Sequence, residues 1–429
     1  MSIINAKNLV WLSIFSAPLY SIKFSFLGIP INIPEVLIIT AFVFWLAENK
    51  KFSWKIFYIR YKVFLAGIFL MLLGLVISAL INPNRLAEWG IIKSWFVIPL
   101  VLSFVLLNEV KSKRGAENIF KALYFSAAAI SFIGLIYFFK GDLTYDFRLK
   151  AFFLSPNYLA MFLSPAVFVG NYFIVSRIKN GLRHLIEKRA AIILFILLLL
   201  SQAAVLSALY LTYSYAAWTA VILSFIIVNL IIKNGEIFKK IKVAAVLLII
   251  LSTILITQAG NSKFNELFNW QASSRSSLAS RIMIWQSAEK ILEDNFLWGI
   301  GPGNFQSKYL EYQKYFPPYL EWAVPQPHNL CLAFWLQGGI LGLAGFICLV
   351  FYWIGEIMKI IRSKISSEND FKKIAPALLG IMIYILLHGI ADTPYWKNDL
   401  AIVFWTVFSL GAVSINFSRS EKILKNPKF

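Results

Sequence analysis

The longest polar stretch of the chain reads RSSLASRIMIWQSAEKILEDNFLWGIGPGNF over residues 275–305 and closes with PQPHNL over residues 325–330. It interrupts a chain that otherwise consists of apolar runs, most of them about the 20 residues that a helix needs to cross a bilayer. We therefore interpret the stretch as part of a loop on one face of a polytopic membrane protein, and we expect its polar groups to carry the function.

The composition supports a membrane protein. The 429 residues are 59% hydrophobic and only 14% charged, whereas soluble domains carry about 25% charged residues. This leaves too little polar surface to cover a water-soluble globule. The alternating pattern of a membrane barrel is absent, so the sequence predicts an all-α bundle of membrane-spanning helices.

Twelve apolar spans divide the chain into three parts: spans one to nine within residues 1–258, an outer loop over 259–327, and spans ten to twelve within 328–429. Eleven spans are an alternative, because the first is short and the eighth begins in polar residues. The expected spans are 8–22, 31–48, 63–81, 92–108, 119–139, 152–175, 190–209, 214–232, 242–259, 328–358, 374–391 and 399–417.

The basic residues indicate the orientation. Connections on one side carry 28 of the 41 Lys and Arg residues, and 6 of the other 13 lie in the long 259–327 loop, which the positive-inside rule does not count. Both termini are therefore predicted to be cytoplasmic and the long loop to face outward. The net charge of +20 follows this orienting pattern, so we expect no nucleic-acid partner. Cys331 and Cys348 share one apolar run and form no disulfide framework or metal-ligand spacing.

Two features of the outer loop are candidates for binding an anion. Residues 277–293 predict an amphipathic helix with Leu278, Ile282, Trp285 and Leu292 on its apolar face, and Arg281 lies one turn before Trp285. An arginine in this setting is either a site residue or an anchor for lipid phosphate. A turn follows, whose backbone amides could face an anion; it contains Gly299, Gly301, Pro302, Gly303 and Asn304.

His328 opens the tenth apolar run, directly after Pro327. The N-terminal end of a helix disfavours the imidazolium cation, so His328 is expected to be neutral and able to accept a proton. A capping or interfacial histidine is the alternative. His388 and Asp392, four residues apart near the outer end of the eleventh span, are further candidates for a site or for a structural pair. Gly338 and Gly339 could bend the tenth span, and Pro165 the sixth.

These motifs together resemble the O-antigen ligase and polymerase superfamily of bacterial membrane glycosyltransferases. The resemblance rests on Arg281 with Trp285, on the glycine turn ending at Phe305, on His328 with Asn329, and on the earlier stretch PNYLA over residues 156–160. One position departs from the family pattern. An arginine that is thought to help hold the diphosphate is replaced by Tyr215, and Arg148, Lys150 or Arg275 could take its place.

The resemblance implies transfer of a glycan from a polyprenyl diphosphate carrier to a lipid or glycan hydroxyl at the outer side of the cytoplasmic membrane, without metal, nucleotide or other cofactor. It implies that Arg281 holds the diphosphate and His328 activates the acceptor, with membrane lipids as further partners. Substrate contacts are expected from Asn329, Gly301, Gly303, Asn304, Trp285, Arg275, Asn157, Tyr215 and Arg148.

Three alternatives stay open at this point. The chain could polymerise glycan repeat units, or transfer glycan to protein, as other branches of the superfamily do. From a different class, it could be a transporter or flippase of lipid-linked sugars, which would place charged residues in the span centres and break helices in pairs.

Overall fold

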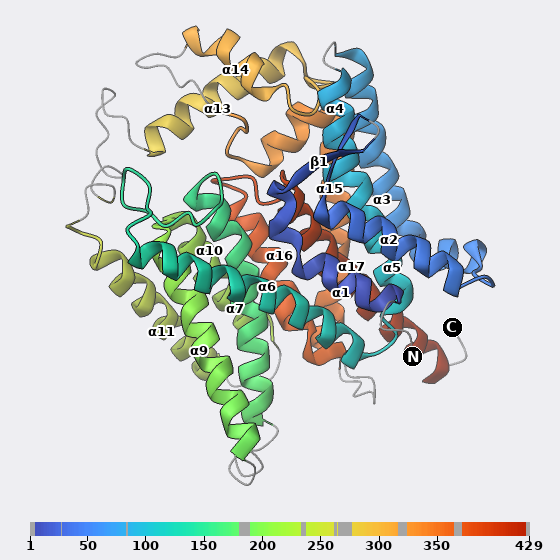
Figure 1. The fold of residues 1–429 in the computed structure, drawn as a ribbon, viewed down its shortest axis with the longest axis vertical. Helices are drawn as coiled ribbons and strands as arrows, with labels where there is room; N and C mark the ends of the chain where they lie inside the picture. Colours follow the sequence, from blue (N-terminus) through green and yellow to red (C-terminus); the bar gives the residue numbers. More distant parts are fainter. Residues whose placement is uncertain are drawn as a thin grey trace.

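The structure is a computed structural model that describes residues 5–26, 28–82, 85–179, 189–232, 237–260, 264, 277–315, 324–363 and 371–425. Within these residues, eight helices are long and apolar enough to cross a membrane. The prediction of an all-α polytopic membrane protein is confirmed (Figure 1).

All twelve apolar runs that were expected to span the membrane are helical. Eight coincide with the long apolar helices, and the other four correspond to α1, α2, α10 and α11. The helices are α1 (Ala6–Phe15), α2 (Ile33–Glu48), α3 (Trp54–Ile81), α4 (Arg85–Ile91), the π-helical turn η2 (Ile92–Val97), α5 (Ile98–Glu109), α6 (Lys113–Phe139), α7 (Pro156–Lys179), α9 (Arg189–Leu211), α10 (Tyr215–Ile231), α11 (Ile237–Ile256), α13 (Ser277–Asp294), α14 (Phe305–Tyr312), α15 (Leu330–Arg362), α16 (Ala375–His388) and α17 (Asn398–Lys425), with short 3₁₀ turns η1 (Ala17–Ser21), η3 (Gln313–Tyr315) and η4 (Phe371–Lys373).

A short β-hairpin precedes α2, and the sequence analysis did not predict it. Strands β1 (Lys23–Phe26) and β2 (Ile29–Asn32) pair antiparallel, and Gly28 lies in the turn with a φ of 79°. The Lys93 ammonium joins the hairpin to the bundle, because it donates to the Pro30 carbonyl at 2.6 Å and to a Glu35 carboxylate oxygen at 2.9 Å.

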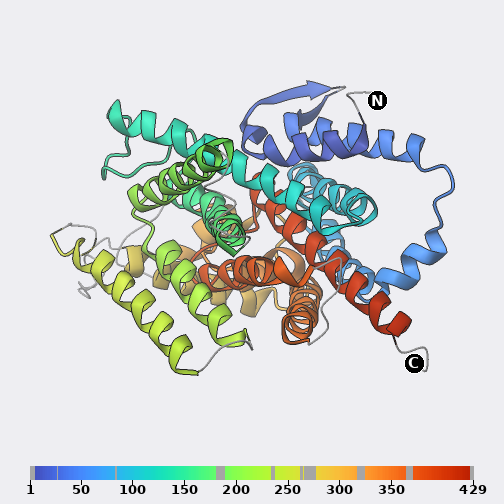
Figure 2. The ribbon, with the colours of Figure 1, turned by 90° about the horizontal axis from the view of Figure 1, so that it is seen from below.

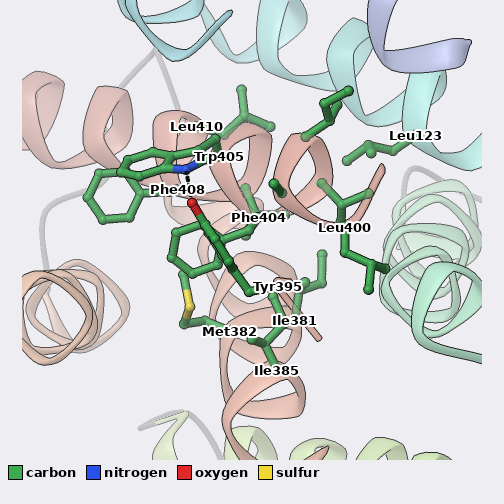
Figure 3. Close-up of a cluster of buried hydrophobic side chains, with 14 of the residues drawn as sticks. Leu123, Ile381, Met382, Ile385, Tyr395, Leu400, Phe404, Trp405, Phe408 and Leu410 are labelled. Atoms are coloured by element: carbon green, nitrogen blue, oxygen red, sulfur yellow. Dashed lines mark hydrogen bonds between the residues drawn. The ribbon is translucent and has the colours of Figure 1, made fainter. Parts of the chain in front are cut away.

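Helix α17 forms the centre of the bundle and α9 lies at its periphery. In the most apolar stretch of α17, 89% of the residues are buried, whereas in that of α9 only 28% are buried. Figure 2 shows α17 crossing the middle of the molecule. On this helix, the Trp405 indole donates to the Tyr395 hydroxyl at 3.0 Å (Figure 3). The same hydroxyl donates to the Trp95 carbonyl at 2.9 Å. These bonds satisfy polar groups that would otherwise be costly in an apolar core.

Helix α15 bends where it passes Leu297 and Trp298. Gly339 has a φ of 63° and a ψ of −170°, which interrupts the helical path, so the bend expected at Gly338 and Gly339 is present. Below the bend, α15 packs closely on α3: a Cβ at Gly74 would lie 2.3 Å from the Gly342 nitrogen. Small residues allow this approach of two helix backbones. Helix α7, in contrast, continues through Pro165.

The polar segment between α11 and α15 contains the predicted amphipathic helix, and part of the expected apolar face is buried. Helices α13 and α14 lie at the opposite end of the molecule from the close of α7 and the start of α9 (Figure 1). The buried stripe of α13 is Ile284, Ala288, Ile291 and Leu292, packed with residues of α14 and α15. Leu292 is therefore buried as expected, and Trp285 packs against the same cluster. Ile282 is exposed, so the expectation is wrong for this residue, because packing on α15 selects the stripe.

Candidate functional site

His328 is brought into contact with Asp392, which lies 64 positions later in the chain. The His328 Nδ1 is 3.2 Å from an Asp392 Oδ1. The Asp392 side chain is 5% exposed and the His328 side chain is 32% exposed, so the carboxylate lies behind the imidazole and the imidazole faces outward. The two residues come from separate loops, one before α15 and the other between α16 and α17.

The backbone before α15 holds His328 in this position. His328 has a φ of 48° and therefore lies outside the helix, not at its first position as expected. The N-cap is Asn329, whose side-chain oxygen accepts from the Leu332 amide at 3.0 Å. The Trp285 indole donates to the Pro327 carbonyl at 3.1 Å, which ties α13 to this turn.

The Asp392 carboxylate accepts two further hydrogen bonds. The Thr393 amide donates at 2.9 Å and the Asn157 side-chain amide donates at 3.1 Å. Burial acts to raise the pKa of Asp392, but the charge and hydrogen bond of His328, helped by Arg281, outweigh it and hold this pKa below its usual range. An ionised carboxylate can only accept, so Nδ1 of His328 must be the donor.

This arrangement fixes which nitrogen of His328 is available. With the proton on Nδ1, the neutral ring presents Nε2 as an acceptor. Nε2 makes no hydrogen bond to any residue that the structure describes. His328 therefore has the geometry of a general base whose tautomer is set by a buried carboxylate.

Arg148 continues the network on the other side of Asn157. Its Nη2 donates to the side-chain oxygen Oδ1 of Asn157 at 2.7 Å, and its Nε donates to the Thr212 backbone carbonyl at 2.7 Å. The Arg148 side chain is only 11% exposed. Burial lowers the pKa of its guanidinium, and the nearby charge of Arg281 lowers it further. The Arg148 guanidinium therefore lies at the turn before α10, within electrostatic range of Tyr215, the position where the family pattern has an arginine.

Arg281 approaches the same loop from α13. Its Nε donates to the Ala391 carbonyl at 2.8 Å, one residue before Asp392. Its Nη1 donates to the Ser277 carbonyl at 3.1 Å and to the Ser277 hydroxyl. Burial lowers the pKa of the Arg281 guanidinium, and the Asp392 charge partly opposes this. Nη2 makes no hydrogen bond within the described part of the chain, so this end of the fork can meet an anion.

The site therefore combines a base and two cations from five parts of the sequence. His328, Asp392, Asn157 and Arg148 form one hydrogen-bonded chain, and Arg281 joins it through the backbone of Ala391. Two guanidinium groups within electrostatic range of each other can neutralise a di-anion, and a neutral imidazole can remove a proton. The arrangement suits displacement of a diphosphate by a hydroxyl group.

The glycine turn has a packing role among the described residues. The Ile300 amide donates to the Leu336 carbonyl at 2.6 Å and the Gly303 amide donates to the Gln337 side chain at 2.8 Å. The Asn304 side-chain amide donates to Glu88 and to the Ile300 carbonyl. These groups are directed into the bend of α15, and a substrate contact by Gly301, Gly303 or Asn304 stays a prediction.

Two further expected residues have local structural partners. The Asn329 side chain caps α15 and donates to the Ile390 carbonyl at 3.3 Å. The His388 and Asp392 side chains do not hydrogen-bond to each other. The His388 Nδ1 lies 2.7 Å from the Tyr384 hydroxyl, and the Asp392 carboxylate contacts His328 instead. Arg275 lies outside the residues that the structure describes.

The sequence analysis did not single out Lys397, which lies behind the site. Its ammonium is buried 3.9 Å from the ring centre of Tyr158, the residue after Asn157, and 4.6 Å from that of Tyr20. Burial lowers the pKa of Lys397, and the charge of Asp399 opposes this shift. The signal in the sequence is the pair of ionisable residues in YWKNDL, directly before an apolar run.

The described residues contain no group of three or more His, Cys, Asp or Glu side chains arranged to hold a metal ion. The polar groups that meet at His328 come instead as one imidazole, one carboxylate, one amide and two guanidinium groups. The two guanidinium groups of this set can donate to an anionic ligand.

Comparison with known proteins agrees with the residues of this site. A family model described as O-antigen ligase matches residues 190–347, which include Arg281, the glycine turn and His328. An O-antigen ligase of Salmonella typhimurium (strain LT2) is 30% identical over 194 residues, which cover 43% of this chain and 45% of that protein. The chain thus spans about half the length of the curated relative that it matches. The matches confirm the resemblance to the O-antigen ligase superfamily.

Proposed function

We propose that this chain is a membrane glycosyltransferase of the O-antigen ligase type. In this proposal it moves a glycan from a polyprenyl diphosphate carrier to an acceptor hydroxyl on the outer side of the bacterial cytoplasmic membrane. The observation that carries the proposal is the chain from His328 through Asp392 and Asn157 to Arg148, with Arg281 beside it. The family match over residues 190–347 supports the same chemistry.

The transfer step needs a base for the acceptor. Nε2 of His328 removes the proton of the acceptor hydroxyl while the oxygen forms its bond to the anomeric carbon of the glycan. The Asp392 carboxylate stabilises the imidazolium that results, because it already accepts from Nδ1. The bond between that carbon and the diphosphate oxygen breaks, and the electron pair leaves with the diphosphate.

The transfer step also needs cations that stabilise the departing diphosphate. Charge builds on the diphosphate as its bond to the glycan breaks, and fixed donors aimed at that charge lower the barrier. Arg148 and Arg281 supply them, since each is held by backbone carbonyls. Among the described residues, the nearest carboxylate contact of either guanidinium is 3.9 Å, from Arg148 to Asp146. In this proposal the two guanidinium groups take the role that a metal ion would have at the diphosphate, and the glycan arrives on its lipid carrier, so the step uses no nucleotide.

The orientation of the site is part of the proposal. The distribution of lysine and arginine predicts that the loops bearing Arg148, Arg281, His328 and Asp392 face outward and that both termini are cytoplasmic. Accessibility labelling in cells tests this, with single cysteines introduced at Tyr145 and at Lys111 after Cys331 and Cys348 are replaced by serine. We expect a reagent that cannot cross the membrane to label residue 145 but not residue 111, and the reverse pattern would contradict the orientation.

The ligase reading is favoured over a polymerase, a protein glycosyltransferase or a flippase, because the similar curated protein bears the name O-antigen ligase. Surface glycan from a deletion strain distinguishes a ligase from a polymerase. Carrier-linked polymer without attachment indicates a ligase, and single-repeat product indicates a polymerase. Loss of glycan attached to protein in the same strain would support a protein glycosyltransferase. Movement of the lipid-linked sugar across a vesicle bilayer without acceptor would support the flippase.

A further inference from the structure

The Lys397 ammonium is enclosed by three aromatic rings. Its Nζ lies 3.9 Å from the ring centre of Tyr158, 4.6 Å from that of Tyr20 and 4.9 Å from that of Phe153. Only 5% of Lys397 is exposed, and its Nζ makes no hydrogen bond to any residue that the structure describes. The face of an aromatic ring carries partial negative charge and attracts a cation, so the rings take the place of hydrogen-bond acceptors around this ammonium.

The carboxylate of Asp399 does not by itself explain this buried ammonium. The charges of Lys397 and Asp399 act on each other, but the two side chains share no hydrogen bond in the described part of the chain. A charge in an apolar core is costly, and an apolar side chain of similar length would fill the same space without that cost. Ionisable residues at such positions in membrane proteins usually have a function.

The ammonium and two of its rings belong to the segments that build the site. The ammonium comes from the loop between α16 and α17, which also carries Asp392. Phe153 belongs to the loop between α6 and α7 that carries Arg148, and Tyr158 follows Asn157 in the first turn of α7. The same three segments are joined by the hydrogen bonds from Arg148 to Asn157 and from Asn157 to Asp392. The cluster of rings therefore makes a second connection between the segments that the hydrogen-bonded chain already links.

We propose that Lys397 is a positioning residue for the transfer site, because its ammonium holds the loop of Asp392 against the start of α7. The contact between the ammonium and the Tyr158 ring fixes the place of Asn157 relative to Asp392. Asn157 then donates to Asp392 at 3.1 Å, and Asp392 accepts from Nδ1 of His328. Lys397 thus acts on the base through other side chains. The inference rests on the proposed function only for the identity of the reaction.

The tautomer of His328 tests the proposal without any need for glycan transfer. The chain has three histidines, so ¹⁵N-histidine labelling of the purified full chain gives few signals, and the loss of signals in His328→Ala assigns those of His328. We expect the neutral ring of the wild type to carry its proton on Nδ1. Asp392→Ala, which removes the acceptor, gives the reference for a ring that is not held. Tyr158→Leu removes one ring but keeps the lysine, and it should move the His328 signals toward that reference.

Two further variants separate positioning from a general loss of packing. Tyr158→Phe keeps a ring face over the ammonium, so it should retain the wild-type tautomer of His328. Phe173→Leu is the matched control, because it removes a ring of the same helix that packs on Tyr172, and it should also retain this tautomer. An unchanged tautomer in Tyr158→Leu, or an equal change in Phe173→Leu, would overturn the proposal.

The lysine itself is tested together with its neighbouring charge. Lys397→Met alone removes the charge that opposes Asp399, so it is combined with Asp399→Asn to limit the loss of stability. The double variant should shift the His328 tautomer as Tyr158→Leu does, whereas Asp399→Asn alone should not. A folded double variant with the wild-type tautomer would overturn the proposal. If the double variant does not fold, Tyr158→Leu decides the question, because the lysine and its neighbouring charge both remain in that variant.

Initial rates of glycan transfer in proteoliposomes add the functional test. Tyr158→Leu should lower kcat about 10-fold or more while the donor Kd stays within about twofold, because misplacing a catalytic group by about 1 Å can cost about 100-fold in rate. The same change in Asp392→Asn protein should lower the rate by less than about twofold, since the ring acts through Asp392. Equal losses in the two backgrounds would contradict the proposal. If wild-type protein transfers no glycan, the proposed function fails, but the tautomer of His328 still decides the role of Lys397.

Discussion

Asp392 accepts a hydrogen bond from Nδ1 of His328 at 3.2 Å, across 64 positions of sequence, and this contact leaves Nε2 of the imidazole facing outward. The carboxylate is itself held by Thr393 and Asn157. The orientation of the proposed base therefore depends on a residue in a different loop, and the predictions below begin from that pair.

Replacing Asp392 with Asn should lower the rate of glycan transfer about 100-fold or more, the scale of a positioned general base. The amide would no longer fix the proton on Nδ1 or stabilise the imidazolium. Initial rates with purified protein give the measurement. The double variant with His328→Ala should be no slower than His328→Ala alone, because the two residues act as a unit. If the rate losses of the two single variants multiplied in the double variant, the two residues would not act as a unit.

The stability of the chain at acid pH should depend on the same carboxylate. The folded-state pKa of Asp392 is held below its unfolded value of about 4. Its contribution is therefore fully present above about pH 4 and is lost as the pH falls through the folded-state pKa. The difference in Tm between wild type and Asp392→Asn should shrink below pH 4. A difference that stays constant from pH 6 to pH 3 would argue against a depressed pKa.

Arg148 should perform the role that the family pattern gives to an arginine at position 215. Arg148→Ala should weaken donor binding and transfer by about 10-fold or more, since a hydrogen bond to a charged group contributes roughly 1.5–3 kcal/mol. Adding Tyr215→Arg should recover part of the loss, because Tyr215 lies within electrostatic range of Arg148. Donor titrations and transfer rates measure both effects. No recovery in the double variant would mean that Arg148 does not stand in for that arginine.

Substitution in the glycine turn should lower the stability of the folded chain. A Cβ at Gly299 would lie 2.3 Å from the Leu336 carbonyl oxygen, and its φ of 69° disfavours a side chain. Gly299→Ala should therefore lower the free energy of unfolding by about 1–3 kcal/mol. Gly355→Ala is the control, since a Cβ there meets nothing within 4 Å. Equal Tm values for the two variants would refute the packing role.

Lys397 and Asp399 should stabilise the chain only as a pair. Both are buried and interact through their charges, although neither the Lys397 ammonium nor the Asp399 carboxylate hydrogen-bonds to a described side chain. Lys397→Met should destabilise the chain because it removes the charge that opposes Asp399, and Asp399→Asn in the same chain should recover most of this loss. A thermal unfolding cycle measures the coupling. Additive losses in the double variant would contradict it.

The helical architecture could be predicted from the sequence because an apolar run of about 20 residues has few alternatives in a bilayer. Arg281 and His328 could be singled out for the same reason: polar residues are rare in this chain and therefore conspicuous. The hairpin of β1 and β2 could not, since its strands merge into neighbouring apolar runs and its pairing depends on contacts such as Lys93 with Pro30.

The partner of His328 was missed for a physical reason. Helical spacing paired Asp392 with His388, four residues earlier, but α16 ends at His388 and the chain turns there. The Leu330 amide donates to the Gly389 carbonyl at 2.7 Å, which brings this turn against the start of α15. Contacts between loops that lie 64 residues apart leave no local pattern in a single sequence, so the network that fixes the imidazole emerges only from the fold.

The most direct test of the proposed mechanism is the initial rate of glycan transfer in proteoliposomes that contain the purified chain, a polyprenyl diphosphate glycan and a lipid acceptor. We expect His328→Ala to lower kcat at least 100-fold while donor binding stays within twofold of wild type. A wild-type kcat in His328→Ala, with the protein inserted and folded, would contradict the assignment of His328 as the base.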